Sequence, residues 1–316
     1  MNVDKIRNRA LAMIDEVERV IVGKRETVHE AVLTLLCNGH LLIEDIPGVG
    51  KTTLAKALAK AMGGEFRRVQ FTPDLLPADI TGSSVYNQQT GEFSFRSGPI
   101  FGNVVLVDEI NRATPKTQSA LLEAMEERTV TTDGETRQLP KPFFVIATQN
   151  SVEMTGTYPL PEAQLDRFFA RVSLGYPDKD SEIDILSRQQ ISHPIDLVNT
   201  VIEPEELMEL QTDIRDVFVH DSVREYIVDL VRATRENPHL LMGTSPRGTL
   251  HLMRAAQANA AISGNDFVRP DDVKATAVAV LAHRVLPRAE SRARGETTGD
   301  LINKVIETVR APVPVS

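Results

Sequence analysis

The chain has 316 residues, of which 41% are hydrophobic and 25% are charged, a composition typical of a globular protein with room for two domains. Its net charge of −9 disfavours a surface that coats nucleic acid, and no apolar run approaches the ~18 residues of a membrane span. The single cysteine, Cys37, excludes an internal disulfide, and together with the absence of a charged and then apolar leader it predicts a cytoplasmic protein.

Two helices are expected before the first strand. Apolar residues at helical spacings predict a helix over residues 1–20, and a second helix is expected at 27–38. A short apolar loop that contains a glycine, Val20-Ile21-Val22-Gly23-Lys24, lies between them. Cys37 follows an apolar stretch of the second helix, and we therefore expect it to be a buried structural thiol.

A phosphate-binding loop is expected directly after the first strand. The apolar run 41–43 is followed by Glu44-Asp45-Ile46-Pro47-Gly48-Val49-Gly50-Lys51-Thr52-Thr53 and then by a helix-forming run. In such a strand, glycine turn and helix, backbone N–H groups and the helix dipole point toward the phosphates. We expect residues 47–53 to bind the nucleotide, with Lys51 as a mobile charge and Thr52 as a hydroxyl ligand of Mg²⁺. Asp45 departs from the full pattern, which has a glycine there.

Buried strands and hairpins are expected to alternate in the next part of the chain. A strand is predicted at 65–71, and the continuous apolar runs that end at 109 and 150 are typical of buried parallel strands. Glycine-containing turns predict β-hairpins at 85–95 and 129–139. A helix at 115–127 with a proline in its first position, a short helix at 161–169 and a last strand at 170–174 complete this part.

The character of the sequence changes between residues 175 and 180. Beyond this point we expect helices only, and Ser222 to Glu225 has the pattern of a capping box. The sequence thus predicts an α/β domain over 1–177 and an all-α domain over 178–316. The expected helices of the second domain are 179–190, 204–217, 222–236, 246–262 and 271–286.

Two carboxylates, Asp108 and Glu109, close one of the buried strands. The carboxyl ends of parallel strands share an edge of the sheet with the phosphate-binding loop, so all these groups are expected in one crevice. We expect Asp108 to hold the metal ion and Glu109 to orient and deprotonate the attacking water. Asn150 ends another strand and is expected to contact that water or the γ-phosphate.

Two arginines stand out by their positions. Ser245-Pro246-Arg247 places a capping serine, a proline and an arginine at the start of a helix, from which Arg247 is expected to point toward a bound phosphate. Arg167 lies at the end of a helix before a strand, and we expect it to reach the nucleotide of a neighbouring subunit.

In combination these motifs resemble the AAA+ ATPases and, within them, the MoxR family. Residues 20–23, which include Val22 and Gly23, are similar to the loop that contacts adenine in AAA+ proteins. Residues 98–101, together with the hairpin before them, are similar to an insert inside helix 2 of the family fold. The hairpin at 129–139 is similar to the insert before sensor 1. Ser151 stands where a proline commonly follows the sensor asparagine. The other matching segments are the phosphate loop (44–52), Walker B (107–112), sensor 1 (147–150), the arginine-finger segment (160–168) and sensor 2 (245–247).

The resemblance implies a parallel sheet sandwiched by helices, with hairpin inserts and a following all-α lid. It also implies that ATP is hydrolysed with Mg²⁺ in a homo-oligomeric ring, expected to be a hexamer. In that geometry Arg247 reaches the phosphates of its own chain and Arg167 those of the next chain, with Arg112 as a further candidate for the second role. The family further implies a chaperone-like role in maturing or assembling protein clients, often with partners that carry a von Willebrand factor A domain.

Three other functions remain open from the sequence. An ATP-driven nucleic-acid remodeller shares the inserts, although the acidic balance and the scarcity of Lys and Arg at both hairpin tips count against it. A magnesium-chelatase-like motor subunit shares the architecture. A nucleotide-gated scaffold that hardly turns over is disfavoured because Glu109, Asn150, Arg167 and Arg247 are all present.

Overall fold

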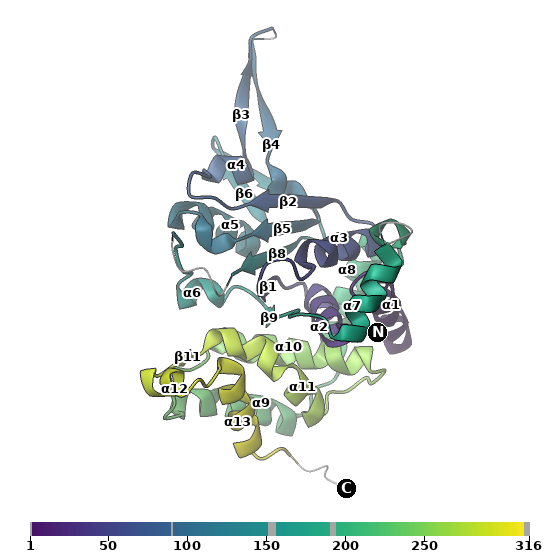
Figure 1. Ribbon diagram of the computed structural model, residues 1–316, viewed down its shortest axis with the longest axis vertical. Helices are drawn as coiled ribbons and strands as arrows, with labels where there is room; N and C mark the ends of the chain where they lie inside the picture. The colour runs from purple at the N-terminus through teal and green to yellow at the C-terminus, as the bar shows by residue number, and fades with distance from the viewer. Residues whose placement is uncertain (1, 90, 151–155, 190–193, 313–316) are drawn as a thin grey trace.

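The computed structural model describes residues 2–89, 91–150, 156–189 and 194–312, and it is built around a five-stranded parallel sheet (Figure 1). The strand order is β2-β5-β8-β1-β9, so β1 lies between β8 and β9. The apolar runs of β5 and β8 are buried almost throughout, as expected for strands with neighbours on both sides. The strands are β1 (Leu41–Glu44), β2 (Phe66–Gln70), β5 (Val104–Asp108), β8 (Phe144–Gln149) and β9 (Ala170–Val172).

Helices cover both faces of this sheet. Alternate residues of β1 serve the two faces, because successive side chains of a strand point in opposite directions. Leu41 and Ile43 belong to a core shared with helices of both parts of the chain, and Leu42 belongs to the core shared with α5. The expected sandwich is thus confirmed. Its helices are α1 (Val3–Glu18), α2 (Arg25–Leu36) and α3 (Lys51–Ala61) on one face and α5 (Pro115–Glu127) on the other.

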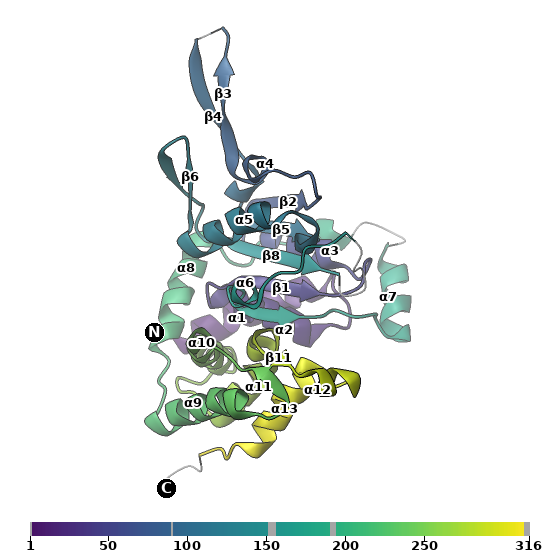
Figure 2. The same cartoon turned by 90° about the vertical axis from the view of Figure 1, so that its left-hand side faces the viewer.

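Two β-hairpins project from the end of the molecule that carries β2 and α5 (Figures 1 and 2). They are β3 (Gly82–Asn87) with β4 (Glu92–Ser97), preceded by α4 (Pro77–Thr81), and β6 (Thr129–Thr132) with β7 (Glu135–Gln138). The hairpins contact each other: the Ser84 hydroxyl donates to the Asp133 carboxylate, and the Arg137 guanidinium lies 3.9 Å from the centre of the Phe95 ring. Both hairpins predicted from turn residues are therefore present.

The part after β9 is mainly helical, but not wholly so. β10 (Leu240–Met242) pairs antiparallel with β11 (Leu286–Pro287), a short two-stranded ribbon that the sequence did not predict within the helical lid, and the helix expected at 271–286 ends at Leu281. The predicted capping box is wrong, because α9 begins at Asp221 and His220 accepts the capping hydrogen bond from the Ser222 N–H. The helices are α6 (Glu162–Leu165), α7 (Lys179–Gln189), α8 (Pro204–Asp213), α9 (Asp221–Glu236), α10 (Pro246–Ile262), α11 (Pro270–Leu281), α12 (Ala289–Ala293) and α13 (Thr298–Thr308).

The helical part is attached to the sheet part through several contacts. α10 packs on α1 and α2, and the Gln211 side chain of α8 donates to the Leu35 carbonyl oxygen at 2.8 Å. The Cys37 thiol donates to the Arg254 carbonyl oxygen, and burial raises its pKa, as expected for an inert structural thiol. Across the ranges that the structure describes, no helix combines the length and apolarity needed to cross a membrane.

Candidate functional site

The loop between β1 and α3 has the shape that phosphate binding requires. Gly48 and Gly50 have φ values of 86° and 98°, in the left-handed region that residues with a Cβ rarely adopt. Gly50 is the N-cap and α3 begins at Lys51, so the first N–H groups of the helix face the loop. The Lys51 amine donates to the backbone carbonyl oxygen of Asp45 at 2.9 Å, across the loop.

A cavity of about 230 Å³ lies beside this loop, at the carboxyl edge of the sheet. It joins three stretches that the sequence analysis singled out separately: the loop, the end of β5 and the end of β8. Parallel neighbouring strands bring their ends to the same edge, which explains this convergence. The cavity is lined by Pro47, Gly48, Gly50, Lys51, Thr52, Arg68, Gln70, Asp108, Glu109, Thr148 and Asn150.

The two carboxylates of this cavity are held by side chains of β2, which the sequence analysis missed. The Arg68 guanidinium donates to the buried Asp108 carboxylate at 2.7 Å, and the Gln70 amide donates to the Glu109 carboxylate at 2.9 Å. Arg112 also pairs with Glu109, at 3.3 Å. Glu109 has a left-handed φ of 56°, and this turn aims its side chain away from the line of the strand.

The charges in the cavity suit a phosphate with a shared metal ion. Partial burial lowers the pKa of the Lys51 amine, while the carboxylates of Asp45, Asp108 and Glu109 oppose that shift. In the described part of the chain, no group of three or more His, Cys, Asp or Glu side chains could hold a metal by itself. The Thr52 hydroxyl and the Asp108 carboxylate, which both line this cavity, are oxygen donors of the kind that would hold a Mg²⁺ ion.

A second, more apolar cavity of about 240 Å³ lies on the other side of the same loop. The two cavities share Gly48 and Gly50, so a ligand can pass over the loop from one to the other. Gly23 is not among the lining residues but packs against Ser181, where a Cβ would come within 2.2 Å of the hydroxyl oxygen. The lining residues are Val20, Ile21, Val22, Lys24, Gly48, Val49, Gly50, Thr53, Gly175, Pro177, Ile185 and Pro194.

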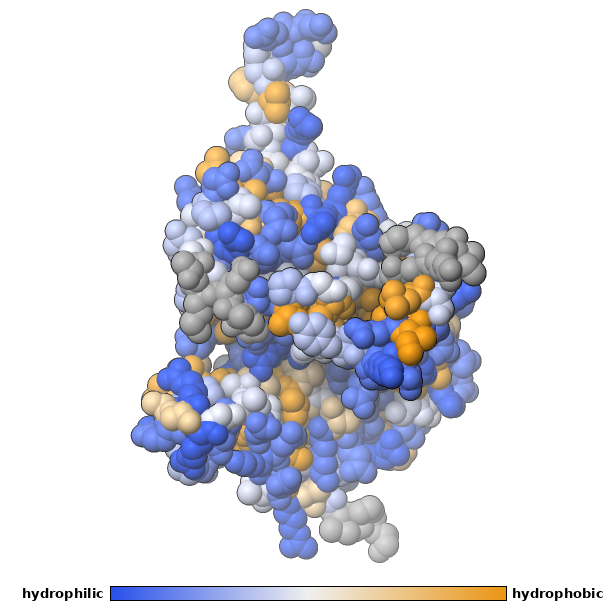
Figure 3. Space-filling model, viewed as in Figure 1, coloured by the Kyte–Doolittle hydropathy of each residue, from blue (hydrophilic) through white to orange (hydrophobic). Residues whose placement is uncertain are grey.

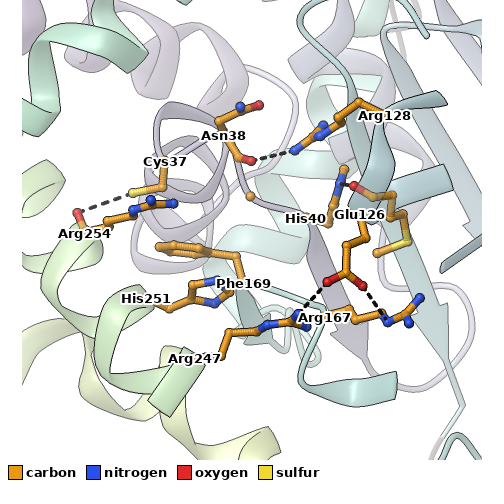
Figure 4. Close-up of a pocket in the computed structure, with 12 residues that line it drawn as sticks. Cys37, Asn38, His40, Glu126, Arg128, Arg167, Phe169, Arg247, His251 and Arg254 are labelled. Carbon is orange, nitrogen blue, oxygen red and sulfur yellow. Dashed lines mark hydrogen bonds and ion pairs between the residues drawn. The ribbon is translucent and has the colours of Figure 1, made fainter. Parts of the chain in front are cut away.

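Arg167 and Arg247 line neither of these cavities and lie together at a third one, of about 210 Å³ (Figure 4). Both pair with the Glu126 carboxylate of α5, Arg167 at 3.2 Å and Arg247 at 2.5 Å. Arg128 and Arg254 line the same cavity. In this structure Arg247 thus lines a cavity other than the phosphate cavity of its own chain, and its approach to those phosphates stays a prediction.

Hydrogen bonds connect the segment that carries Arg167 to the start of α10. The Asp166 carboxylate accepts hydrogen bonds from the Ser245 hydroxyl at 3.0 Å and from the Arg284 guanidinium at 2.9 Å. The Arg284 side chain is only 1% exposed, and burial lowers its pKa to about 10. Ser245 also caps α10, accepting from the Arg247 N–H as predicted. Arg167 and Arg247 thus lie at one junction that these contacts connect.

Comparison with known proteins agrees with this geometry. The family model described as "ATPase family associated with various cellular activities (AAA)" matches residues 40–170, and that of the "AAA lid domain" matches residues 232–305. The chain is 41% identical over 308 residues to the chaperone MoxR1 of Mycobacterium tuberculosis, which covers 95% of this chain and 81% of that protein. The chain belongs to the MoxR family of AAA ATPases. The MoxR protein of Methylorubrum extorquens is 31% identical, over 97% of this chain and 96% of its own length.

Two further relatives match the MoxR-family chain over nearly its whole length. The uncharacterized protein YeaC of Bacillus subtilis is 51% identical, with 95% of this chain and 94% of that protein covered. A crystal structure from Cytophaga hutchinsonii superimposes with a TM-score of 0.92 at 39% identity, covering 99% of this chain and 97% of that one. The expected family, AAA fold and ATPase activity are thereby confirmed, and AAA membership implies that the chain binds ATP.

Proposed function

We propose that this MoxR-family ATPase is one subunit of a homo-oligomeric ring, expected to be a hexamer, that hydrolyses ATP at subunit boundaries and acts like a chaperone on protein clients. The observation that carries the proposal is the separation of the two halves of the active site. One cavity has the phosphate loop and the two carboxylates, and another has Arg167 and Arg247. A complete site therefore takes two copies of the chain.

Within one subunit, the residues of the first cavity have the roles that phosphoryl transfer needs. Residues 47–53 and Lys51 bind the phosphates, and the apolar cavity with Val22 takes the adenine. Thr52 and Asp108 hold Mg²⁺, which neutralises phosphate charge when it is bound. Glu109 orients and deprotonates the attacking water, and Asn150 contacts that water or the γ-phosphate.

The two arginines complete the site of the neighbouring subunit. Because Glu126 and the Asp166 junction keep them together, we assign both Arg167 and Arg247 to the same nucleotide, that of the next chain. Arg112 pairs with Glu109 of its own chain, and it stays a further candidate for the trans-acting role. We retain 1–177 and 178–316 as the proposed domains, with α8 attached to the first by its contacts.

The hairpins supply the proposed contact with protein clients. The Tyr86 and Phe93 rings face each other across β3 and β4 with centres 5.2 Å apart and planes tilted by 53°, and the two residues are 51% and 73% exposed. Apolar side chains interrupt the otherwise polar surface there (Figure 3). The turn between these strands has no Lys or Arg, so the surface suits an extended polypeptide better than nucleic acid. A relative named as a chaperone supports this choice. Proteins with a von Willebrand factor A domain, which the family resemblance implies, are the proposed partners.

Mixing two inactive variants tests the shared site. Lys51→Ala lacks a working phosphate loop but keeps its arginines, whereas Arg167→Ala keeps its loop but is expected to lose about 10³-fold in turnover. Mixed rings should recover part of the ATPase activity that neither variant has alone, and Arg247→Ala should behave like Arg167→Ala in the same assay. The matched control is the double variant Lys51→Ala/Arg167→Ala, which should rescue nothing. If mixed rings form and no mixture regains activity, the arginines do not act between subunits.

A further inference from the structure

Asp45 stands where the phosphate-loop pattern has its first glycine, and the residue is only 6% exposed. One carboxylate oxygen, Oδ2, accepts three hydrogen bonds from the segment after β9. The donors are the Ser173 hydroxyl at 3.0 Å and the backbone N–H groups of Leu174 and Gly175 at 2.6 and 2.8 Å. The other oxygen accepts from the Ile46 N–H at 2.9 Å. A glycine at this position could make none of these contacts.

The backbone of Asp45 has its own partners, which any residue could provide. Its N–H donates to the Gln149 carbonyl oxygen at 3.1 Å, and its carbonyl oxygen accepts from the Lys51 amine. The side chain is therefore what distinguishes this loop from one with a glycine. Because burial without partners is costly for a carboxylate, the four donors explain why it can be retained here.

The segment that Asp45 holds is a wall of the apolar cavity. Gly175 and Pro177 line that cavity, and Gly48 and Gly50 line both it and the phosphate cavity. Asp45 thus touches the loop on one side and the chain that leads into the wall of the second cavity on the other. Its position between the two suggests a function beyond the stability of the loop.

We propose that Asp45 is a positioning residue that fixes the apolar cavity relative to the phosphate cavity, so that one nucleotide can occupy both. The proposal rests on the proposed function in one respect, namely that the base and the phosphates of ATP take these two cavities. Without the carboxylate, the N–H groups of Leu174 and Gly175 lose their acceptor and the wall shifts, whereas Lys51 keeps its backbone acceptor. Binding of the base suffers, and binding of the phosphates alone does not.

The test is the variant Asp45→Gly, which restores the common pattern. Affinities for ATP and for inorganic triphosphate are measured by displacement of a fluorescent ATP analogue. We expect the ATP affinity to fall about tenfold, because hydrogen bonds to a charged acceptor are lost. The triphosphate affinity should change less than about twofold. An unchanged ATP affinity, or an equal loss for both ligands, would overturn the proposal.

Two variants keep the test sound if Asp45→Gly does not fold. Ser173→Ala removes one of the three donors and Asp45→Asn weakens the acceptor, so each should give a smaller loss that is still selective for ATP. Loss of that selectivity in both would also overturn the proposal. The matched control is Glu44→Gln, because the neighbouring Glu44 carboxylate pairs with Arg171 at 2.8 Å instead of with this segment. Its ATP affinity should stay within about twofold. Failure of the wild-type protein to bind ATP would contradict the proposed function itself.

Discussion

Arg68 and Gln70 reach the two carboxylates of the phosphate cavity from β2, about 40 residues earlier in the chain. Nothing near Asp108 and Glu109 in the sequence points to them, because the pairing of β2 with β5 is not encoded locally. The only local signal is a pair of polar side chains at alternate positions near a strand end, and such pairs are common on protein surfaces. Functional partners that depend on strand order are therefore missed by motif analysis.

Gln70→Ala should lower kcat about tenfold while ATP affinity changes little, because Glu109 remains present but is less well oriented. The Gln70 amide donates to the Glu109 carboxylate at 2.9 Å, and the Arg112 pair alone would hold it at 3.3 Å. Steady-state ATPase kinetics and ATP titration measure the two quantities. The exposed Gln138→Ala on β7 is the control and should leave both unchanged. An unaltered kcat in Gln70→Ala would show that Glu109 needs no such support.

At the scale of elements, those with strong local signals were predictable from the sequence. The apolar runs of β5 and β8, the glycine turn before α3 and the Ser245 cap of α10 each carry their signal within a few residues. The pairing of β10 with β11 does not, because strands of three and two residues have no periodicity to detect. The cap of α9 was misassigned because a histidine, His220, replaced the expected serine.

The exposed rings of the β3–β4 hairpin should matter for clients and not for ATP hydrolysis. The double variant Tyr86→Ser/Phe93→Ser removes this pair of rings, which are 51% and 73% exposed, and the basal ATPase activity should stay unchanged. Binding of an unfolded polypeptide, measured with ATP in a Glu109→Gln background, should weaken about tenfold or more. Val228→Ser replaces another exposed apolar residue, 43% exposed on α9, and should have no effect. Undiminished binding by the double variant would remove the hairpin from the proposed client surface.

The folded protein should become less stable in mild acid because of His251, a buried α10 residue that pairs with Arg284 at the junction with the Arg167 segment. The Nδ1 atom of His251 pairs with the Arg284 guanidinium at 2.6 Å, which requires a neutral ring, and burial first and then Arg284 lower the pKa of His251 to about 2. The unfolded chain takes up a proton on this ring near pH ~6.5 and the folded chain does not. The free energy of unfolding therefore falls as the pH drops below ~6.5, approaching about 1.4 kcal/mol per pH unit for this residue. Burial lowers the pKa values of His40 and His283 in the same direction.

Denaturant unfolding at about pH 7.5 and about pH 5.5 measures this dependence. His251→Gln should reduce the loss of stability between the two conditions, although it weakens the protein at both. The control is the exposed Gln138→Ala on β7, which should leave the pH dependence unchanged. A pH dependence that is the same in His251→Gln and in the wild type would contradict the assignment.

At the scale of the whole molecule, the packing of the lid determines where the arginines lie. The sequence predicted that Arg247 begins a helix, which is confirmed, but not that α10 packs on α1 and α2 and brings Arg247 next to Arg167. Lid placement depends on contacts between residues about 200 positions apart, such as Cys37 with Arg254. A motif describes its own neighbourhood and carries no information about such contacts.

Assembly should depend on the nucleotide, because ATP bound at a subunit boundary adds contacts only in the assembled state. Sedimentation of the protein with and without a slowly hydrolysed ATP analogue measures this. We expect larger species with the analogue, and a weaker response in the Arg167→Ala/Arg247→Ala double variant. The exposed Arg232→Ala on α9 is the control. A monomer at high concentration in both conditions would contradict the proposed ring.

The junction made by Asp166, Ser245 and Arg284 also gives the proposed ring a direction. In the proposed ring, the lid of each subunit is held next to Arg167 and Arg247, which we assign to the next subunit's nucleotide and which do not line the phosphate cavity of their own chain. When one subunit loses its γ-phosphate, the lid that first responds would be that of the neighbouring subunit whose arginines reach this nucleotide. That neighbour has a nucleotide of its own. The effect of each hydrolysis event would pass from subunit to subunit in one direction around the ring. The order in which the subunits hydrolyse ATP would therefore follow from the direction in which they are arranged.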